Sequence, residues 1–427
     1  MTASGTVRVL LVTDSFPPHC GGSGWSTYEL ARGLRARGHD VSLVQPRPRQ
    51  SRDARREHDG FVVDEIAAAA PPVPFVRNYF KNERLWSMLT RRLVARLDRS
   101  PADLIHAQHV LTTVPAARAG RATGIPVVAT VRDYWPVCYW SDLIYDFDAD
   151  HLCPACTAGN MRRCLRGRAG AAGTLAWPLI PYMRANLARK RAALGSLDTL
   201  IAVSSVIAAD LAARAPELSG TRVEQIPNPV DIAGIRAAAD TALPPLDAPY
   251  ALYVGKLEPN KGVTHLVDVA VESRLPWPLV VVGDGRLRGA IEQRAGAAGV
   301  DVRVQGWLPR EQVLAWMRHA SLLVFPSLGP ESLSRVLLES AALGLPIAAM
   351  DTGGTRDIVV PGVTGLLSQS ASGLARDVAR LHGDAGLRAQ LGEAARRHVE
   401  HAFDAPAVVA RVERVYRDAV ARRGHGG

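Results

Sequence analysis

The sequence lacks any run of about 20 apolar residues, so no membrane-spanning helix is expected. No secretory signal is expected in its start, MTASGTVRVLLVTDSFPP, because the apolar stretch from Val7 to Val12 is short and contains Arg8. Cysteine is scarce, with five residues among 427. An odd number of cysteines without a secretory signal favours reduced thiols and a cytoplasmic location.

Motifs for two ligand classes are also missing. The loop CGGSGW follows an expected strand, but its spacing is not G-x-G-x-x-G and no acid ends the next strand, which argues against a dinucleotide oxidoreductase. The formal charge is +10, yet no DNA or RNA motif accompanies it, so no nucleic-acid partner is expected. A basic chain suits nucleotides or phospholipid headgroups, although arginine-rich codon usage gives the same balance.

What the sequence does contain is a repeated alternation of strands and helices. VRVLLVTDS reads as a buried strand, a glycine loop follows, and STYELARGLRARG reads as a helix capped by Ser26 and ended by Gly38. A second series begins at YALYVGKLEPNKG. The pattern predicts an α/β protein with two Rossmann-like, doubly wound parallel-sheet domains.

The expected domain limits follow from the two series. The first domain covers residues 1–225, with an insert at about 134–190, and the second covers residues 226–404. The last helix, within residues 405–427, has no strand after it, so we expect it to pack back on the first domain.

Two glutamates lie in FPSLGPESLSRVLLESAALGLP. Glu331 follows a strand, at the sheet edge where doubly wound folds bind ligands. Ser332 or Ser334 can cap the next helix, and Glu339 lies about 12 Å further along if that helix contains both acids. A carboxylate there can accept hydrogen bonds from ribose hydroxyls. The alternative is that Glu339 is a solvated helix residue and that Glu331 only interacts with the helix dipole.

Three further loops in the second domain suit a ligand. GKLEPNKG places Lys256 and Lys261 after a strand, where they can hold a diphosphate. GDG, containing Gly283 and Asp284, and TGGTRDIV, from Thr352, follow two other strands. Four such loops at the strand ends of one domain indicate a ligand site.

These motifs together resemble the retaining glycosyltransferases of family 4. The matching runs are YVGKLEPNKGV, VVGDGRL and PESLSRVLLESAALGLPIAAMDTGGTRDIVVPGVTGLL, with DSFPPHCGGSGWSTYELARGLRARGHDV in the first domain. The resemblance implies the GT-B fold, in which two domains face a central cleft. It implies sugar transfer from a nucleoside-diphosphate sugar with retention of configuration and without an obligatory metal.

The resemblance also implies roles for matching positions. Glu339 would bind the nucleotide ribose, Glu331 the donor sugar, and Lys256 and Lys261 the diphosphate. The remaining expected donor contacts are Gly22, Gly283, Asp284 and the backbone N–H groups of Ser332, Leu333 and Ser334.

The first domain departs from the family pattern. A histidine is usual nearest Gln108, so His109 is a displaced candidate for the catalytic group, and the alternative is a plain histidine at a strand end. His106 is a second histidine nearby. Arg132 replaces another expected histidine, which puts the acceptor-side chemistry in doubt and motivates an inactive sugar-nucleotide-binding scaffold as the alternative function. An epimerase or phosphorylase is a weaker one.

The insert raises two further expectations. Four of its cysteines, one pair spaced C-x2-C, can form a structural zinc site, or they can be plain reduced thiols: Cys138, Cys153, Cys156 and Cys164. The segments Phe75–Arg99 and TLAWPLIPYMRANLARKR are basic and aromatic, so they can touch an anionic membrane surface, line an acceptor cleft or cover the sheet.

The sequence is therefore read as a glycosyltransferase located in the cytoplasm or on the inner face of the membrane. Its expected acceptor is a sugar, a lipid-linked sugar or a small molecule. The expected setting is the synthesis of polysaccharides, glycolipids or natural-product glycosides. The donor base and sugar are left open.

Overall fold

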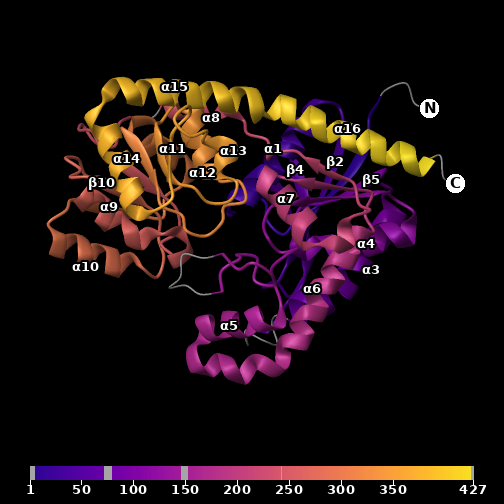
Figure 1. Cartoon of the computed structure of the whole chain (residues 1–427). Helices are drawn as coiled ribbons and strands as arrows, with labels where there is room; N and C mark the ends of the chain where they lie inside the picture. The colour runs from indigo at the N-terminus through magenta and orange to yellow at the C-terminus, as the bar shows by residue number, and fades with distance from the viewer. Residues whose placement is uncertain (1–4, 72–78, 146–151, 242, 425–427) are drawn as a thin grey trace. The chain divides into compact units, whose positions relative to one another are not determined.

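The structure is a computed structural model that describes residues 5–71, 79–145, 152–241 and 243–424. The chain forms two compact units (Figure 1). The first comprises Met1–Asp142, Pro154–Pro229 and Ala405–Gly427, and the second comprises Leu143–Cys153 and Val230–Asp404. The division thus falls four residues after the expected limit at residue 225, and a short part of the expected insert belongs to the second unit.

An eight-stranded sheet forms the centre of the first unit, in the order β3-β4-β2-β1-β5-β6-β7-β8. All its pairs are parallel except β3 with β4. The strands are β1 (Arg8–Val12), β2 (Asp40–Arg47), β3 (Ala54–His58), β4 (Phe61–Ala67), β5 (Leu104–Ala107), β6 (Val127–Val131), β7 (Thr199–Ala202) and β8 (Val223–Gln225).

Helices of the first unit precede or follow the strands of its sheet. They are α1 (Gly22–Ala36), α3 (Leu85–Arg99), α4 (Val110–Thr123), α5 (Ala158–Ala169), α6 (Ile180–Gly195), α7 (Ser205–Arg214) and α16 (Ala405–Gly424), with a π-helical turn η1 (Phe80–Arg84) and the 3-10 segments η2 (Gly170–Leu179) and η3 (Pro216–Leu218). Helices α1 and α16 share one apolar cluster with β1 and β2, while α4 packs against α3 and α6.

The first helix starts earlier than its sequence suggests. It begins at Gly22 with Gly21 at the N-cap, and the Ser26 hydroxyl donates to the Gly22 carbonyl instead of capping. The expected Ser26 cap was wrong because the glycine loop itself turns into the helix. Its first turn therefore directs backbone N–H groups toward the end of β1.

A parallel six-stranded sheet forms the second unit, in the order β11-β10-β9-β12-β13-β14. Its strands are β9 (Ala251–Val254), β10 (Leu279–Val282), β11 (Val302–Gly306), β12 (Leu322–Phe325), β13 (Ile347–Met350) and β14 (Leu366–Ser368). Its helices are α8 (Ile232–Asp240), α9 (Leu266–Glu272), α10 (Arg288–Ala298), α11 (Arg310–His319), α12 (Arg335–Ala342), α13 (Thr355–Ile358), α14 (Ala371–Gly383) and α15 (Ala385–Ala402), with the 3-10 turns η4 (Pro259–Lys261) and η5 (Val263–His265).

Each sheet has one point where the direction of winding reverses. In the first unit the chain leaves β1 toward β2 and leaves β5 toward β6, so the reversal lies between β1 and β5. In the second unit the corresponding neighbours are β9 and β12. Right-handed crossovers put the following helices on opposite faces there, which opens a crevice at the carboxyl ends of the two strands.

The last helix belongs to the first unit. Helix α16 packs against α1, where the absence of a side chain at Gly33 gives room to Val409. Arg37 at the end of α1 forms an ion pair with the buried Glu413 at 2.6 Å. The chain thus ends in the unit in which it begins.

Candidate active site

A histidine held between two aspartates occupies the switch point of the first unit. His109 is the N-cap of α4, directly after β5, and its Nδ1 lies 2.7 Å from Asp14, which follows β1. Its Nε2 lies 3.4 Å from Asp133, which follows β6. Burial opposes the charged ring, but Asp14 and Asp133 outweigh it and raise the pKa of His109 to about 10. The group is therefore an imidazolium between two carboxylates at neutral pH.

The neighbours of His109 are buried polar residues. Arg132 donates from Nε to the Asn228 side chain at 2.8 Å and from a terminal nitrogen to the Gln108 carbonyl at 2.8 Å. Burial lowers the pKa of Arg132 to about 10. The Gln108 side chain is also buried, and its amide atoms have no hydrogen-bond partner among the described residues. Arg132 thus ties β6 to the segment after β8, a structural role that the sequence did not reveal.

His106 is a structural residue of the core. Its ring is fully buried and lies 2.5 Å from the Tyr416 hydroxyl of α16 and 2.7 Å from the Thr130 hydroxyl. Burial holds the pKa of His106 well below its usual range, so the ring is neutral. Of the two histidines on this strand end, only His109 faces other charged groups at the switch point.

Close backbone approaches bring the loops of the second unit together at its switch point. Gly262, after β9, has φ +63°, and a Cβ there would lie 1.8 Å from the Pro326 carbonyl after β12. Gly353, after β13, has φ +54°, and its Cβ would lie 2.1 Å from the Glu331 carbonyl. Only glycine fits both positions, so three loops meet around Glu331.

Glu331 is anchored by two side chains. Its Oε1 lies 2.6 Å from Nζ of Lys261 and accepts a 2.6 Å hydrogen bond from Ser327. Its side chain is only 11% exposed, so the Lys261 ammonium is the partner that makes burial of the carboxylate tolerable. Lys261 and Glu331, two residues of the predicted site, therefore form a direct ion pair across the switch point, which the sequence analysis did not predict.

Glu339 lies in α12 and is buried among arginines. Arg335 and Arg310 donate to Oε1 at 2.9 Å and 3.0 Å, and the Glu339 side chain is 8% exposed. All its described hydrogen bonds go to Oε1. The helix begins at Arg335, so Glu331 lies outside it and the 12 Å helical spacing does not apply. Glu339 is therefore not the solvated helix residue of the alternative interpretation.

The other expected donor contacts of the second unit follow the carboxyl ends of its strands, and one further contact lies in the first unit. Ser334 is the N-cap of α12 and accepts from the Leu337 N–H, so Ser332 and Leu333 lie in the loop before it. Gly283 follows β10 and donates to the Gly306 carbonyl, while Asp284 is exposed. Lys256 is exposed after β9. Gly22 opens α1 in the first unit.

Comparison with known proteins decides the family. A family model described as Glycosyltransferase Family 4 matches residues 20–233, and one described as Glycosyl transferases group 1 matches residues 237–398. The chain belongs to glycosyltransferase family 4. The predicted family is thus confirmed, the two sheets are those of the GT-B fold, and the protein is a transferase of the EC 2.4 class.

Relatives of this family 4 enzyme span most of the chain. It is 29% identical over 84% of both chains to the GDP-mannose-dependent alpha-mannosyltransferase of Mycolicibacterium smegmatis. It is 26% identical to the glycogen synthase of Mycobacterium tuberculosis, with 98% and 96% of the two chains covered. The sucrose-phosphate synthase of Thermosynechococcus elongatus superposes with a TM-score of 0.71 at 20% identity, covering 97% of this chain and 100% of that one.

The cysteine expectation stays a prediction in this family 4 protein. Cys138, Cys156 and Cys164 lie in the first unit and Cys153 in the second. Among the described residues no three His, Cys, Asp or Glu side chains are grouped as ligands for a metal ion. Cys164 instead accepts a 3.2 Å hydrogen bond from Arg168. Zinc analysis of the purified, reduced protein tests the prediction.

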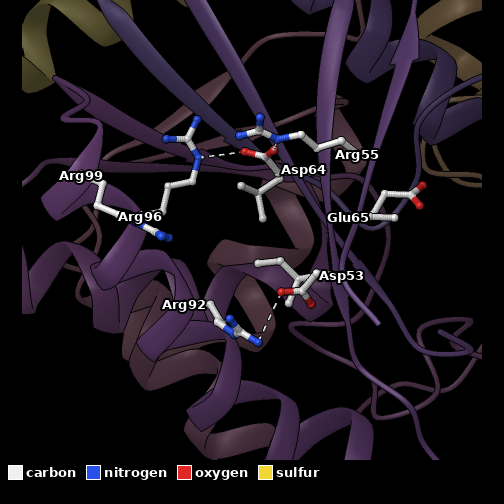
Figure 2. Close-up of a pocket in the computed structure, with 10 residues that line it drawn as sticks. Asp53, Arg55, Asp64, Glu65, Arg92, Arg96 and Arg99 are labelled. Atoms are coloured by element: carbon white, nitrogen blue, oxygen red, sulfur yellow. Dashed lines mark hydrogen bonds and ion pairs between the residues drawn. The ribbon is translucent and has the colours of Figure 1, made fainter. Parts of the chain in front are cut away.

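The first basic segment of the glycosyltransferase covers its sheet. The apolar face of α3 is buried through Leu85, Trp86, Leu89, Leu93 and Leu97. Its arginines line a cavity of about 460 Å³ together with residues of β3, β4 and the segment before them. Arg92 pairs there with Asp53 and Arg96 with Asp64 (Figure 2). Phe75 and Arg77 lie outside the described residues. Of the three interpretations left open, α3 fits the covering of the sheet.

None of the helices that the structure describes has both the length and the apolar character needed to span a bilayer.

Proposed function

We propose that the protein transfers a sugar from a nucleoside-diphosphate sugar to an acceptor with retention of anomeric configuration. The observation that carries the proposal is the pair of anchored glutamates at the second switch point, Glu331 on Lys261 and Glu339 on Arg335 and Arg310. Each has a fixed carboxylate, and exposed Lys256 and the loop before α12 lie at the same sheet edge.

In this proposal Glu339 binds the ribose. Its Oε1 is held by the two arginines, which leaves Oε2 to accept hydrogen bonds from the ribose hydroxyls. Lys256, Lys261 and the backbone N–H groups of Ser332, Leu333 and Ser334 bind the diphosphate. Because the diphosphate leaves with increasing negative charge, donors already fixed at that position lower the barrier. Gly22, Gly283 and Asp284 complete the proposed donor contacts.

Glu331 and His109 are assigned to the sugars. The Glu331 carboxylate is placed to accept hydrogen bonds from the donor sugar and to balance positive charge on its anomeric carbon. The His109 imidazolium, held by Asp14 and Asp133, is a hydrogen-bond donor for a sugar oxygen once a ligand displaces one carboxylate contact. His109 thus orients and stabilises, and it is too basic to serve as a general base at neutral pH.

The first test is calorimetric binding of UDP, GDP, ADP and TDP. We expect one diphosphate to bind selectively, and Glu339→Ala to weaken it by about tenfold or more because ribose contacts are lost. Glu393→Ala is the matched control, since Glu393 also pairs with arginines on a helix of the same unit. No binding of any diphosphate by folded protein would contradict the donor site.

The second test is transfer itself. The GDP-mannose in the name of the mannosyltransferase relative makes GDP-mannose the first donor to try. Retention predicts the same anomeric configuration in donor and product, read from the NMR coupling of the anomeric proton. Selective binding without transfer to any acceptor would favour the inactive scaffold. The proposed setting is the synthesis of polysaccharides, glycolipids or glycosides at the cytoplasmic side of a membrane.

A further inference from the structure

The first unit contains an apolar cavity that donor binding does not use. It lies between a helical hairpin, defined here as α5, η2 and α6, and the segments that carry Tyr79, Tyr139 and Trp140. The hairpin projects from the sheet of that unit (Figure 1). The cavity has a volume of about 210 Å³. Its walls include the rings of Tyr79, Tyr139, Trp140 and Tyr182, together with Leu179 and Met183.

Large apolar side chains on the same hairpin are exposed to solvent. Leu175 is 82% exposed, Trp177 41% and Leu179 38%, and all three lie in η2. Leu179 also lines the cavity, so exposed apolar surface reaches the cavity wall. Such grouped exposure marks a surface that meets a partner.

The positive charge of the hairpin indicates which charge that partner carries. Residues 154–197 contain eight Arg and Lys and no Asp or Glu, so this segment supplies eight of the ten net positive charges of the chain. Several of these cations lie beside the aromatic rings: Arg162 is 5.3 Å from the centre of Trp177, and Arg168 is 4.9 Å from that of Trp140. Arg168, Arg189 and Arg191 are paired with acidic side chains outside the segment, whereas Arg162, Arg166 and Arg184 are exposed. These exposed arginines beside apolar side chains suit a partner that carries an anionic group next to an apolar part.

The cavity walls favour a hydrocarbon chain over a sugar. A sugar ring can stack the C–H groups of one face on an aromatic side chain, but each of its rim hydroxyl groups must still find a hydrogen bond when it is buried. Aromatic, leucine and methionine side chains make up most of these walls. A hydrocarbon chain needs no hydrogen bonds and gains from leaving water.

We propose that the helical hairpin binds a phosphate-bearing lipid of a bilayer. One hydrocarbon chain occupies the cavity, the phosphate lies against arginines of α5, and Leu175 and Trp177 enter the bilayer surface. The hairpin follows β6, the strand whose carboxyl end carries Asp133 beside His109. We also assign the acceptor of the sugar transfer to this class of lipid, and this second assignment rests on the proposed function.

Co-sedimentation with vesicles tests the surface. We expect binding to phosphatidylcholine vesicles that contain phosphatidylglycerol, and little binding to phosphatidylcholine alone. Leu175→Asp should weaken binding by about tenfold, because a charge replaces an inserted apolar group. Leu243→Asp is the matched control, since Leu243 is 86% exposed in the second unit. Equal effects of the two substitutions, or no binding at low salt, would overturn the proposal.

Calorimetry with monomeric octyl phosphate tests the cavity. Octyl phosphate should bind more tightly than inorganic phosphate, and Leu179→Asp should remove most of that difference. Equal binding of the two phosphates would mean a free-phosphate site and would overturn the chain assignment. An unchanged octyl phosphate affinity in Leu179→Asp would overturn it as well.

Binding of the nucleoside diphosphate separates this inference from the proposed function. Leu175→Asp and Leu179→Asp should both still bind the nucleoside diphosphate, and this binding also shows that the two variants are folded. Lipid binding without diphosphate binding would support the lipid site on the hairpin and contradict the proposed donor site. Transfer to a soluble acceptor by a protein that binds neither vesicles nor octyl phosphate would overturn the lipid inference alone.

Discussion

Carboxylates at both switch points are paired with cations inside the protein. Asp14 and Asp133 contact His109, Glu331 contacts Lys261, and the two arginines hold Glu339. A part-buried carboxylate without a partner is strongly disfavoured, so these pairs fix the side chains before a ligand arrives. A substitution that removes one member of such a pair should therefore also change the position of the other member.

The charge of His109 is expected to persist well above neutral pH. Its pKa is about 10 in the folded protein against 6.5 for a free histidine. NMR titration should show one imidazolium that stays protonated beyond pH 8. Asp14→Asn should lower this pKa because it removes the contact at 2.7 Å. A His109 that titrates near pH 6.5 in the unchanged protein would contradict the assignment.

The same shift predicts how stability depends on pH. Because the folded protein binds the His109 proton more tightly than the unfolded chain, this contribution is fully present below about pH 6.5 and is lost as the pH rises toward 10. The difference between the unchanged protein and His109→Gln in free energy of unfolding should therefore shrink across that interval. Denaturant titrations at pH 6 and pH 9.5 measure it.

Glu331→Gln should separate binding from transfer. The amide keeps the shape of the side chain but removes the charge that faces the donor sugar in the proposed site. We expect diphosphate affinity to change little and the transfer rate to fall by about 100-fold or more. Glu258→Gln, in the loop after β9 and paired with Arg286, is the control and should keep the rate. Loss of diphosphate binding in Glu331→Gln would contradict the assigned role.

The sequence predicted the site residues at the second switch point more completely than those at the first. Lys261, Glu331 and Glu339 stand in continuous motifs that follow strands, so their presence at one sheet edge follows from the expected topology. The pairing of His109 with Asp14 and Asp133 joins residues from three strand ends, and no single motif contains them. One partner of Glu339, Arg310, was missed for the same reason, because it lies 29 positions away. The other partner, Arg335, stands in the motif itself, four positions before Glu339.

At the scale of elements, α16 carries a buried polar contact into the first unit. The Tyr416 hydroxyl is the partner of one ring nitrogen of the neutral, buried His106. Tyr416→Phe leaves that nitrogen without a partner, so the free energy of unfolding should fall by about 1–3 kcal/mol. Tyr28→Phe is the control with a smaller loss, because the Asp59 carboxylate that it leaves is 52% exposed. Equal losses would contradict the role of α16.

Hairpin β3–β4 is the element that sequence reasoning overlooked. Its two turn residues, Asp59 and Gly60, have φ values of +49° and +69°. Asp-Gly between two short strands is a strong hairpin signal, so this element could have been predicted. The fold was predicted from the alternation of strands and helices, and an antiparallel edge strand does not follow that alternation. The hairpin was therefore not predicted.

For the whole molecule, the excess of positive charge is concentrated in one segment of the chain. The +10 balance looked like a property of the entire chain, but residues 154–197 supply eight of those charges. The rest of the protein is thus close to neutral. Arg168, Arg189 and Arg191 of this segment pair with acidic side chains outside it. The attraction of the hairpin for an anionic partner therefore comes from its other, exposed arginines, and it should weaken as salt screens it.

Transfer by the whole enzyme should not depend on a divalent metal. In the proposed donor site the charges that meet the diphosphate come from Lys256, Lys261 and backbone N–H groups, while Glu331 and Glu339 already have cationic partners. Incubation with EDTA followed by its removal should therefore leave both diphosphate binding and transfer rate within about twofold. Lys261→Ala measured in parallel should lose transfer with or without EDTA. A rate that EDTA abolishes and added Mg²⁺ or Mn²⁺ restores would contradict this account of the leaving group.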